Sequence, residues 1–347
     1  MKRAENYYVY LCNTLAELLS VDSPTGFSRA VNERLQGHLE ELGYTVEISN
    51  KRLVKVSVKG KSSAKRLALS AHVDTLGALV KGIDGDGKIR FSVLGGPILP
   101  TWDGEYCRIY ADGGKCYTGT FLCDSPSCHV YRDASTKERN EATMYVRIDE
   151  EVASAADVAA LGIRTGSMSA LDTKTRFTDS GYVKSRFLDD KAGSACLLTV
   201  LNMMKEEGLV PAYDVDFYFT NYEEVGHGAA TLGDADELLA VDMGCVGAGL
   251  ACKETQVSIC VKDSRGPYDY EMVERLLALA KENGLDYAAD VYPYYGSDVD
   301  AAYAAGKNLK GGLIGPGVHA SHGMERTHLK GIYNTIDLIA AYLTKAI

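Results

Sequence analysis

The chain has 347 residues, of which 46% are hydrophobic and 24% charged, and its formal net charge is -10. This composition predicts a soluble globular protein with one large or two smaller domains. The negative charge and the lack of long Lys/Arg runs exclude nucleic acid and an anionic membrane as main partners. Nine scattered cysteines favour reduced thiols, and with no long apolar run they indicate a cytoplasmic protein.

The first 77 residues alternate between helical and extended patterns. Leucines at helical spacing predict a helix that ends near Asp22, and a second helix ends at about Leu42. Strands are predicted at residues 44–49, 52–58 and 66–71. The third strand leads into His72 and Asp74, which share one face of an extended chain. An imidazole beside a carboxylate is a common metal-binding arrangement, although a hydrogen-bonded core histidine explains a lone His-x-Asp equally well.

The sequence changes character over residues 78–176. Glycine and proline pairs separate short β-like runs there, and a helical pattern at 152–161 interrupts them only briefly. Cysteines and a histidine lie close together in this segment, but their spacing matches no zinc-binding pattern. We expect a small β-rich domain inserted into a discontinuous catalytic domain formed by residues 1–77 and 177–347.

Two acidic pairs follow the insertion. Asp189 and Asp190 precede an apolar helix, where they could simply cap it and favour its dipole. Glu223 and Glu224 follow a predicted buried strand at 213–219. Carboxyl ends of strands are where open α/β sheets place their sites, and neighbouring residues there point in different directions. We therefore expect different roles for the two glutamates, against the alternative of a solvated acidic pair.

The last third of the chain adds one aspartate and a histidine-rich segment. A short strand at 238–241 ends at Asp242, a helix is predicted at 270–283, and Gly296-Ser297-Asp298 opens a shorter helix. A strand at 309–314 is followed by three histidines within ten residues and then by a closing helix. These histidines are His319, His322 and His328.

The carboxylates and imidazoles form one donor set near predicted strand ends. Its members are His72, Asp189, Glu223, Glu224, Asp242 and the segment from His319 to His328. Two imidazoles with three carboxylates suit Zn²⁺ or Co²⁺, and one carboxylate could bridge two ions. A further carboxylate left free of metal can move protons during hydrolysis.

These motifs, in this order, resemble those of the glutamyl and tetrahedral (TET) aminopeptidases, which are dinuclear zinc exopeptidases. The resemblance covers almost the whole chain. The matching segments are Ser70-Ala71-His72-Val73-Asp74, Leu188-Asp189-Asp190-Lys191-Ala192-Gly193, Tyr222-Glu223-Glu224-Val225-Gly226, Val241-Asp242 and Gly296-Ser297-Asp298. It implies an α/β fold, with a mixed-sheet, three-layer zinc-peptidase catalytic domain and an inserted barrel-like dimerisation domain at residues 78–176.

The resemblance also implies roles for the residues. Two divalent metal ions per chain are expected, zinc first and cobalt as the alternative. The ligands of one ion would be His72, Asp189 and Asp242, and those of the other Asp189, Glu224 and a C-terminal histidine. Glu223 would be the general base, and Asp74 would orient His72.

The C-terminal histidine is where the chain departs from the family pattern. The family usually has Arg-Tyr-x-His-Ser, with a glutamate four residues after the histidine. Alignment on Ile314-Gly315 places His322 at the ligand position, with Glu325 three residues further on. His328 is a competing imidazole, and the preferred N-terminal residue of the substrate stays open.

The function implied is hydrolysis of N-terminal residues from peptides with a free N-terminus, by a homo-oligomer. A related dinuclear deacylase or carboxypeptidase would use the same ligands. A glycosidase with Glu223 and Glu224 as its acid pair is disfavoured, because such pairs stand roughly 5–9.5 Å apart across the scissile bond. A non-catalytic scaffold is the remote alternative, since no ligand is lost.

Overall fold

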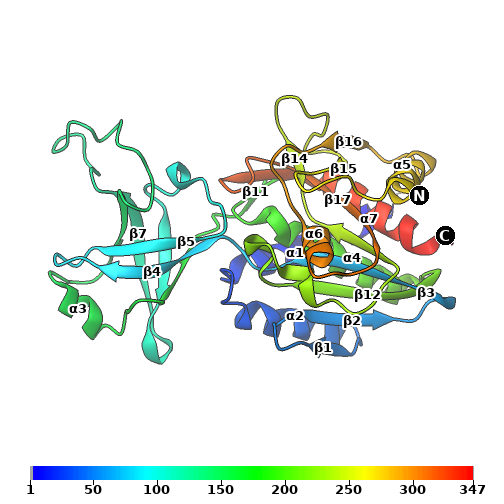
Figure 1. The fold of residues 1–347 in the computed structure, drawn as a ribbon, viewed down its shortest axis with the longest axis horizontal. Coiled ribbons are helices and arrows are strands. Elements are labelled where there is room, and N and C mark those ends of the chain that lie inside the picture. The colour runs from blue at the N-terminus through cyan, green and yellow to red at the C-terminus, as the bar shows by residue number, and fades with distance from the viewer. Residues whose placement is uncertain (1–2, 347) are drawn as a thin grey trace.

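The computed structural model describes residues 3–346 and consists of a large α/β body and a smaller β-barrel (Figure 1). The helices are α1 (Tyr8–Ser20), α2 (Arg29–Glu41), α3 (Ala155–Ala160), α4 (Leu188–Glu207), α5 (Tyr270–Glu282), α6 (Asp298–Ala304) and α7 (Leu329–Thr344). Only α3 belongs to the barrel segment (Figure 1). No helix within residues 3–346 combines the length and apolarity needed to cross a membrane.

The large body is built on one mixed sheet of 12 strands. These are β1 (Val46–Ile48), β2 (Val54–Val58), β3 (Ser62–His72), β10 (Arg176–Phe177), β11 (Tyr182–Ser185), β12 (Tyr213–Thr220), β13 (Glu237–Val241), β14 (Gly244–Val246), β15 (Val257–Lys262), β16 (Tyr287–Val291), β17 (Lys310–His319) and β18 (Glu325–His328). The main path runs β1-β2-β12-β3-β13-β17-β18-β11-β10. Its centre, β12-β3-β13-β17, is parallel, and antiparallel strands flank it.

Helices cover both faces of this sheet, as two adjacent glycines of β17 illustrate. A Cβ on Gly311 would meet Val299 of α6, whereas one on Gly312 would meet Met272 of α5. Since successive residues of a strand face opposite sides, α5 and α6 lie on opposite faces. α4 and α7 pack against each other, and α7 also contacts α5. The predicted fold class, a mixed-sheet α/β body with a barrel, is confirmed.

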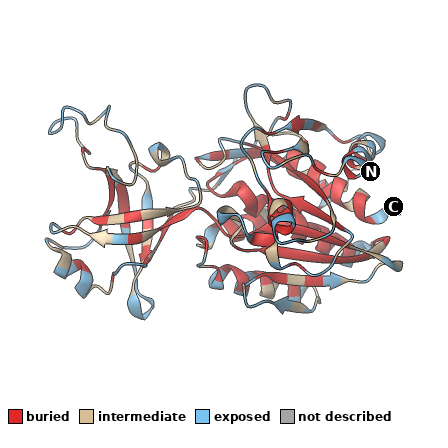
Figure 2. Cartoon of the chain, in the orientation of Figure 1, coloured by how far each residue is buried: buried red, intermediate tan, exposed pale blue. Residues whose placement is uncertain are grey.

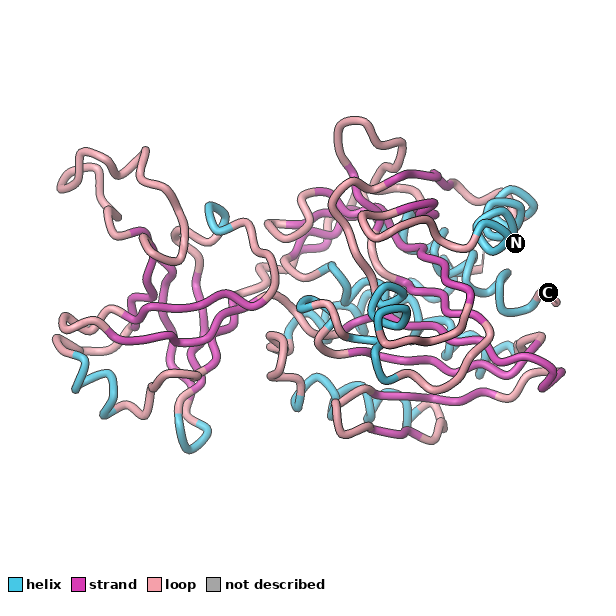
Figure 3. The backbone as a smooth tube through the Cα atoms, in the orientation of Figure 1, coloured by secondary structure: helices cyan, strands magenta, loops and turns pink. Residues whose placement is uncertain are grey.

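The barrel is closed by six antiparallel strands in the order β4-β5-β8-β7-β6-β9. Their bounds are β4 (Gly77–Ile83), β5 (Ile89–Leu94), β6 (Tyr106–Tyr110), β7 (Cys116–Cys123), β8 (Met144–Ile148) and β9 (Met168–Leu171). Phe91, Trp102 and Phe121 pack as an aromatic core, with Phe91 edge-on to Phe121 at 5.0 Å. The connection from β7 to β8, residues 124–143, is a long loop without helix or strand (Figure 3).

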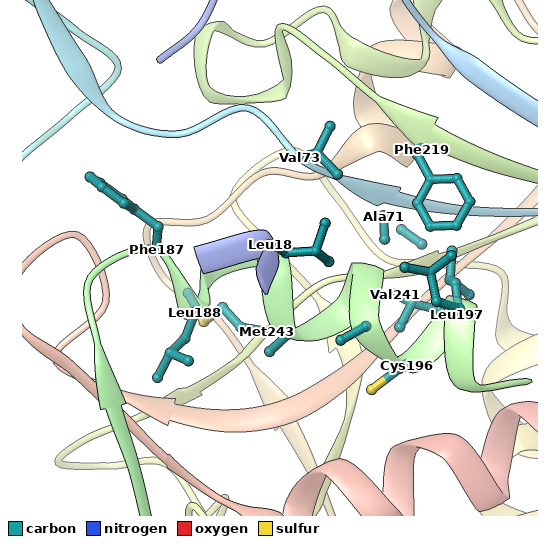
Figure 4. Close-up of a cluster of buried hydrophobic side chains, with 14 of the residues drawn as sticks. Leu18, Ala71, Val73, Phe187, Leu188, Cys196, Leu197, Phe219, Val241 and Met243 are labelled. Atoms are coloured by element: carbon teal, nitrogen blue, oxygen red, sulfur yellow. The ribbon is translucent and has the colours of Figure 1, made fainter. Parts of the chain in front are cut away.

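Buried residues concentrate on the central strands and on the helices that face them (Figure 2). Side chains from β3, β12, β13 and α4 meet in one apolar cluster, among them Ala71, Phe219, Val241 and Leu197 (Figure 4). Full burial of each large apolar side chain contributes roughly 1.5–3 kcal/mol. Packed apolar side chains therefore fix the strand ends and the start of α4, directly next to His72, Asp189 and Asp242.

The C-terminal strand is longer than the sequence predicts. β17 continues from Lys310 through Gly315-Pro316-Gly317 to His319, although glycine and proline favour a break there. A Cβ on Gly315 would lie 1.6 Å from the carbonyl oxygen of Asp242, so this glycine permits close backbone approach instead of a turn. Pro316 lies opposite Val257 of β15, where no turn occurs.

Candidate metal centre

Three neighbouring parallel strands bring the proposed site residues to one edge of the sheet. Thr220, the last residue of β12, lies opposite His72, the last residue of β3. Glu223 and Glu224 follow in a 3-10 turn, and Asp242 follows β13, which pairs with β3 on its other side. Parallel strands end at the same edge, so these side chains converge although the sequence separates them widely.

Asp189 lies between two imidazoles at the start of α4. Its Oδ1 is 3.1 Å from Nε2 of His72, and its Oδ2 is 3.5 Å from Nε2 of His322. Phe187, with φ of 65°, turns the chain so that Asp189 points into the cluster. The hydroxyl of Ser321 donates to Asp189 Oδ2 at 3.0 Å. Each oxygen of this carboxylate therefore faces a different histidine.

Backbone carbonyls fix both imidazoles in one tautomer. Nδ1 of His72 lies 2.9 Å from the carbonyl oxygen of Asp74, and Nδ1 of His322 lies 2.9 Å from that of Gly96. A carbonyl oxygen only accepts, so each Nδ1 carries the hydrogen. Nε2 is then the nitrogen that faces Asp189, and a ring that keeps its hydrogen on Nδ1 and offers Nε2 is the usual form of a metal-ligating histidine.

Two further carboxylates stand next to this core. Glu224 Oε2 is 3.7 Å from His322 Nε2, and Asp242 Oδ2 is 4.0 Å from His72 Nε2. Asp242 Oδ1 accepts the N–H of Met243 at 2.6 Å. Asp189 thus has candidate ligands on both sides, His72 and Asp242 on one and His322 and Glu224 on the other. Ligand atoms of His72, Asp189 and Glu224 all lie within 4.8 Å of one another.

The buried, crowded carboxylates of this cluster favour a bound cation. Burial and the charge of Asp189 raise the pKa of Glu224 well above its usual range and that of Asp242 to about 7. Within residues 3–346, Glu224 Oε1 is buried without a hydrogen-bond partner. Burial lowers the pKa of His322, but Asp189 and Glu224 outweigh it and raise this pKa to about 10. Crowded carboxylates, an orphaned buried oxygen and imidazole lone pairs together fit divalent cations.

Asp190 is close enough to be considered a ligand, and its hydrogen bonds argue against that role. Its atoms group with His72 and Asp242 within 4.8 Å. However, its Oδ2 accepts the N–H of His72 at 3.1 Å, and its Oδ1 accepts that of Gly193 at 3.0 Å. These bonds anchor the end of β3 to the start of α4. Asp190 therefore has a structural role, and Asp189 is the better candidate ligand of the two.

Glu223 differs from Glu224 in what it faces. Its Oε2 is 3.7 Å from His72 Nε2, and its side chain is 14% exposed, against 4% for Glu224. Burial raises the pKa of Glu223 well above its usual range. Both glutamates line a cavity of about 740 Å³ that opens above the cluster. Glu223 is thus the carboxylate more open to that cavity.

Asp74 contacts both His72 and Glu223, in a way that the His-x-Asp motif does not predict. Its carboxylate is 3.7 Å from His72 Nδ1, which instead donates to the Asp74 carbonyl. The carboxylate accepts the hydroxyl of Thr25 at 2.7 Å and the N–H of Glu223 at 3.2 Å. One residue therefore orients His72 through its backbone and positions Glu223 through its side chain.

Only one of the three C-terminal histidines reaches the cluster. His328 is occupied elsewhere, with Nε2 2.9 Å from the Ser180 carbonyl and Nδ1 accepting the N–H of Lys330. His319 is exposed at the end of β17. Glu325, which the motif comparison only noted for its irregular spacing, is buried and supports the site. Its two oxygens accept the N–H groups of Asp189 and His322, each at 3.0 Å.

Comparisons with known proteins agree with this geometry. The family model of the M42 glutamyl aminopeptidases matches residues 53–338. YhfE of Bacillus subtilis (strain 168), provisionally named an aminopeptidase, is 41% identical over 331 residues, which are 95% of this chain and 96% of YhfE. Among solved structures, a TET aminopeptidase from the marine sediment archaeon Thaumarchaeota archaeon SCGC AB-539-E09 has a TM-score of 0.88 at 19% identity, covering 97% of each chain. TET1 peptidase of Pyrococcus horikoshii, which assembles into a tetrahedron or an octahedral shell, has a TM-score of 0.85 at 21% identity, covering 97% of this chain and all of that one.

Proposed function

The chain belongs to the M42 glutamyl aminopeptidase family of peptide-bond hydrolases, and we propose that it is an aminopeptidase that uses two divalent cations. Zn²⁺ suits the mixed imidazole and carboxylate donors best, and Co²⁺ is the alternative. The observation that carries this proposal is the position of Asp189, with one oxygen toward His72 and the other toward His322. Such a carboxylate is suited to bridge two cations.

The residues proposed to hold the cations form two sets that share one member. The first set is His72, Asp189 and Asp242, and the second is Asp189, Glu224 and His322. Divalent cations at such sites lower the pKa of water and polarise the carbonyl under attack. The carbonyl oxygens of Asp74 and Gly96 keep both imidazoles in the ligating tautomer.

Glu223 is proposed to move the proton. It accepts a proton from the attacking water and returns it to the nitrogen of the departing amine, as a general base and then a general acid. Its backbone N–H is held by Asp74, which fixes where its carboxylate stands relative to His72. Burial, which raises its pKa, favours both transfers near neutral pH.

We further propose that the barrel mediates self-association. Large apolar residues are exposed on its surface, among them Tyr106 at 61%, Val130 at 72% and Tyr131 at 41%. Exposed apolar groups of this kind often mark protein interfaces. The assembly stated for Pyrococcus horikoshii TET1 peptidase supports a homo-oligomer here.

The decisive substrate test compares a free with a blocked N-terminus. Zn²⁺- or Co²⁺-loaded enzyme should hydrolyse leucine p-nitroanilide and leave N-acetyl-leucine p-nitroanilide intact. The reverse preference would make the protein a deacylase with the same ligands. Release of C-terminal residues from N-blocked peptides would make it a carboxypeptidase.

A further inference from the structure

A buried arginine lies where the barrel segment meets the loop that carries His322. Arg186 directly follows β11 and is 2% exposed. Its Nη2 donates to the carbonyl oxygen of Thr101 at 2.7 Å, and its Nη1 donates to that of Gly323 at 3.1 Å. Thr101 ends a short 3-10 helix in the barrel segment. Gly323 is the neighbour of His322 in the loop between β17 and β18. One guanidinium therefore joins three segments that are far apart in the sequence.

A simple ion pair does not account for Arg186. Its Nη2 is 3.7 Å from Oε1 of Glu105, whose Oε2 pairs with Lys174 at 2.7 Å. Burial lowers the pKa of Arg186, and the charges of Glu105 and Glu325 offset this effect only in part. A buried charge costs free energy unless it is paired and hydrogen-bonded. The two carbonyl oxygens that Arg186 bridges are therefore an important part of what keeps it buried.

The loop that contains His322 has a strained backbone. Ala320 has a φ of 59° and His322 a φ of 64°, in the left-handed region that residues other than glycine rarely adopt. Such conformations persist only where the surrounding structure holds them. If its contacts were lost, the loop would relax, and the ring of His322 would move with its backbone.

The contacts that hold this loop include several from the barrel segment. The N–H of Ile98 donates to the carbonyl oxygen of His322 at 3.1 Å, and the carbonyl oxygen of Gly96 accepts from the His322 ring at 2.9 Å. These two bonds fix the backbone and the ring of the same residue. Arg186 adds a charged donor one residue further along the loop.

The ligands proposed for the other cation have a different support. His72 ends β3, and Asp242 follows β13, so both belong to the central parallel strands of the large body. The carbonyl oxygen of Asp74 orients the ring of His72. Removal of the donors of Arg186 should therefore affect the two cation sites unequally.

We propose that Arg186 is a positioning residue that fixes the loop of His322 against the barrel segment and thereby sets the affinity for one of the two cations. This inference rests on the proposed two-cation site and adds a residue that acts through His322. Groups that orient a metal-ligating histidine contribute to its affinity, and their loss typically weakens metal binding 10- to 100-fold.

The test is a calorimetric titration of Co²⁺ into chelator-treated wild type, Arg186→Met, Arg186→Lys and Arg108→Met. Methionine keeps an apolar chain but has no donor, whereas lysine keeps the charge without the planar fork. Arg108→Met is the matched control, because Arg108 joins the barrel to the body elsewhere, through hydrogen bonds to Asp22 and Leu171. A parallel titration of His322→Ala identifies the binding step that belongs to the cation of His322.

Arg186→Met should weaken the cation of His322 by roughly 10- to 100-fold and the other cation by less than about threefold. Arg186→Lys should show a smaller loss, because an ammonium group still donates to a carbonyl. Arg108→Met should keep both affinities, although it removes a contact between the same two parts of the molecule. At saturating Co²⁺, turnover of leucine p-nitroanilide by Arg186→Met should return to within about threefold of wild type, because only metal binding is impaired.

Equal weakening of both cations, or unchanged affinities in folded Arg186→Met, overturns the role of Arg186 and leaves the aminopeptidase proposal standing. If Arg186→Met does not fold, Arg186→Lys provides the same comparison. If wild type binds fewer than two cations, the proposed two-cation site fails, and amide hydrogen exchange of residues 320–325 in metal-free protein decides on Arg186. Faster exchange in the Arg186 variant than in Arg108→Met supports the positioning role, and equal exchange contradicts it.

Discussion

Asp189 directs one carboxylate oxygen at each of two imidazoles, 3.1 Å from His72 Nε2 and 3.5 Å from His322 Nε2. The histidines come from distant parts of the sequence, one at the end of β3 and one between β17 and β18. Asp189 is itself held by the buried Glu325, which also holds His322.

The adjacent glutamates should respond differently to the same change. Glu223→Gln should lower kcat by roughly 10²–10⁴, because a general base is lost, while both metals stay bound. Glu224→Gln should instead weaken metal binding, because a ligand oxygen is replaced. Metal content and turnover are measured on the same samples. Loss of metal in Glu223→Gln, with full metal in Glu224→Gln, would reverse the two assignments.

Substitutions of His322 and His328 should also differ in their effects on metal binding and stability. His322→Ala should reduce the bound metal toward one ion per chain and lower activity at limiting metal. His328→Ala should keep both ions but lose the cap of α7, at a cost of about 0.5–2 kcal/mol in folding free energy. Metal titration and thermal unfolding distinguish these effects. One metal in the His328 variant, with two in the His322 variant, would transfer the ligand role to His328.

A charged contact joins the barrel to the catalytic body. Arg108 of β6 donates to both oxygens of Asp22 at 2.5 and 2.7 Å, and Tyr110 donates to the same carboxylate. Arg108→Met should destabilise the protein by roughly 1–3 kcal/mol, since this pair is only partly exposed.

The control for this contact is the exposed pair of Arg164 and Asp112 in the same barrel, with side chains 66% and 59% exposed. Arg164→Met should change stability by less than about 0.5 kcal/mol. Thermal denaturation compares both variants with wild type. Equal shifts in Tm would show that Arg108 contributes no more than a surface pair.

Self-association should depend on the apolar part of the long barrel loop. Val130→Glu together with Tyr131→Glu should shift the mass in solution toward that of a single chain, because charge is placed on the exposed apolar surface. Ser135→Glu, an exposed polar position in the same loop, is the control. Light scattering at micromolar concentration provides the readout. A wild type that is already monomeric would contradict the proposal.

Much of the fold could be predicted, because hydrophobic periodicity and strand-end motifs are local signals. The strand before Glu223 is predicted at 213–219 and observed as Tyr213–Thr220, and the helix predicted at 270–283 is Tyr270–Glu282. β14, β15 and β16 were not predicted, although Val257–Lys262 is largely buried. Their pairing with β17 and with each other depends on tertiary contacts that periodicity does not encode.

The residues around the site were less predictable than those at its centre. The motif containing Asp74 indicates a carboxylate beside His72, but the contact that orients the ring comes from the Asp74 backbone. The carbonyl of Gly96, from the barrel segment, orients His322 over a separation of 226 residues. Every residue has a backbone carbonyl, so the residue type does not show which carbonyls accept these hydrogen bonds. How the insertion contributes to the site therefore emerges only from the folded chain. The proposed domain boundaries, at residues 78 and 176, stay a prediction.

The proposed activity requires metal at the cluster around Asp189. The direct measurement is titration of Zn²⁺ or Co²⁺ into chelator-treated protein, with bound metal per chain and leucine p-nitroanilide turnover recorded at each step. We expect no turnover without metal and full turnover at two ions per chain, because the buried carboxylates and imidazoles lack their cations until then. Undiminished turnover in metal-free protein, or full turnover reached while no metal is bound, would contradict a metal-dependent activity.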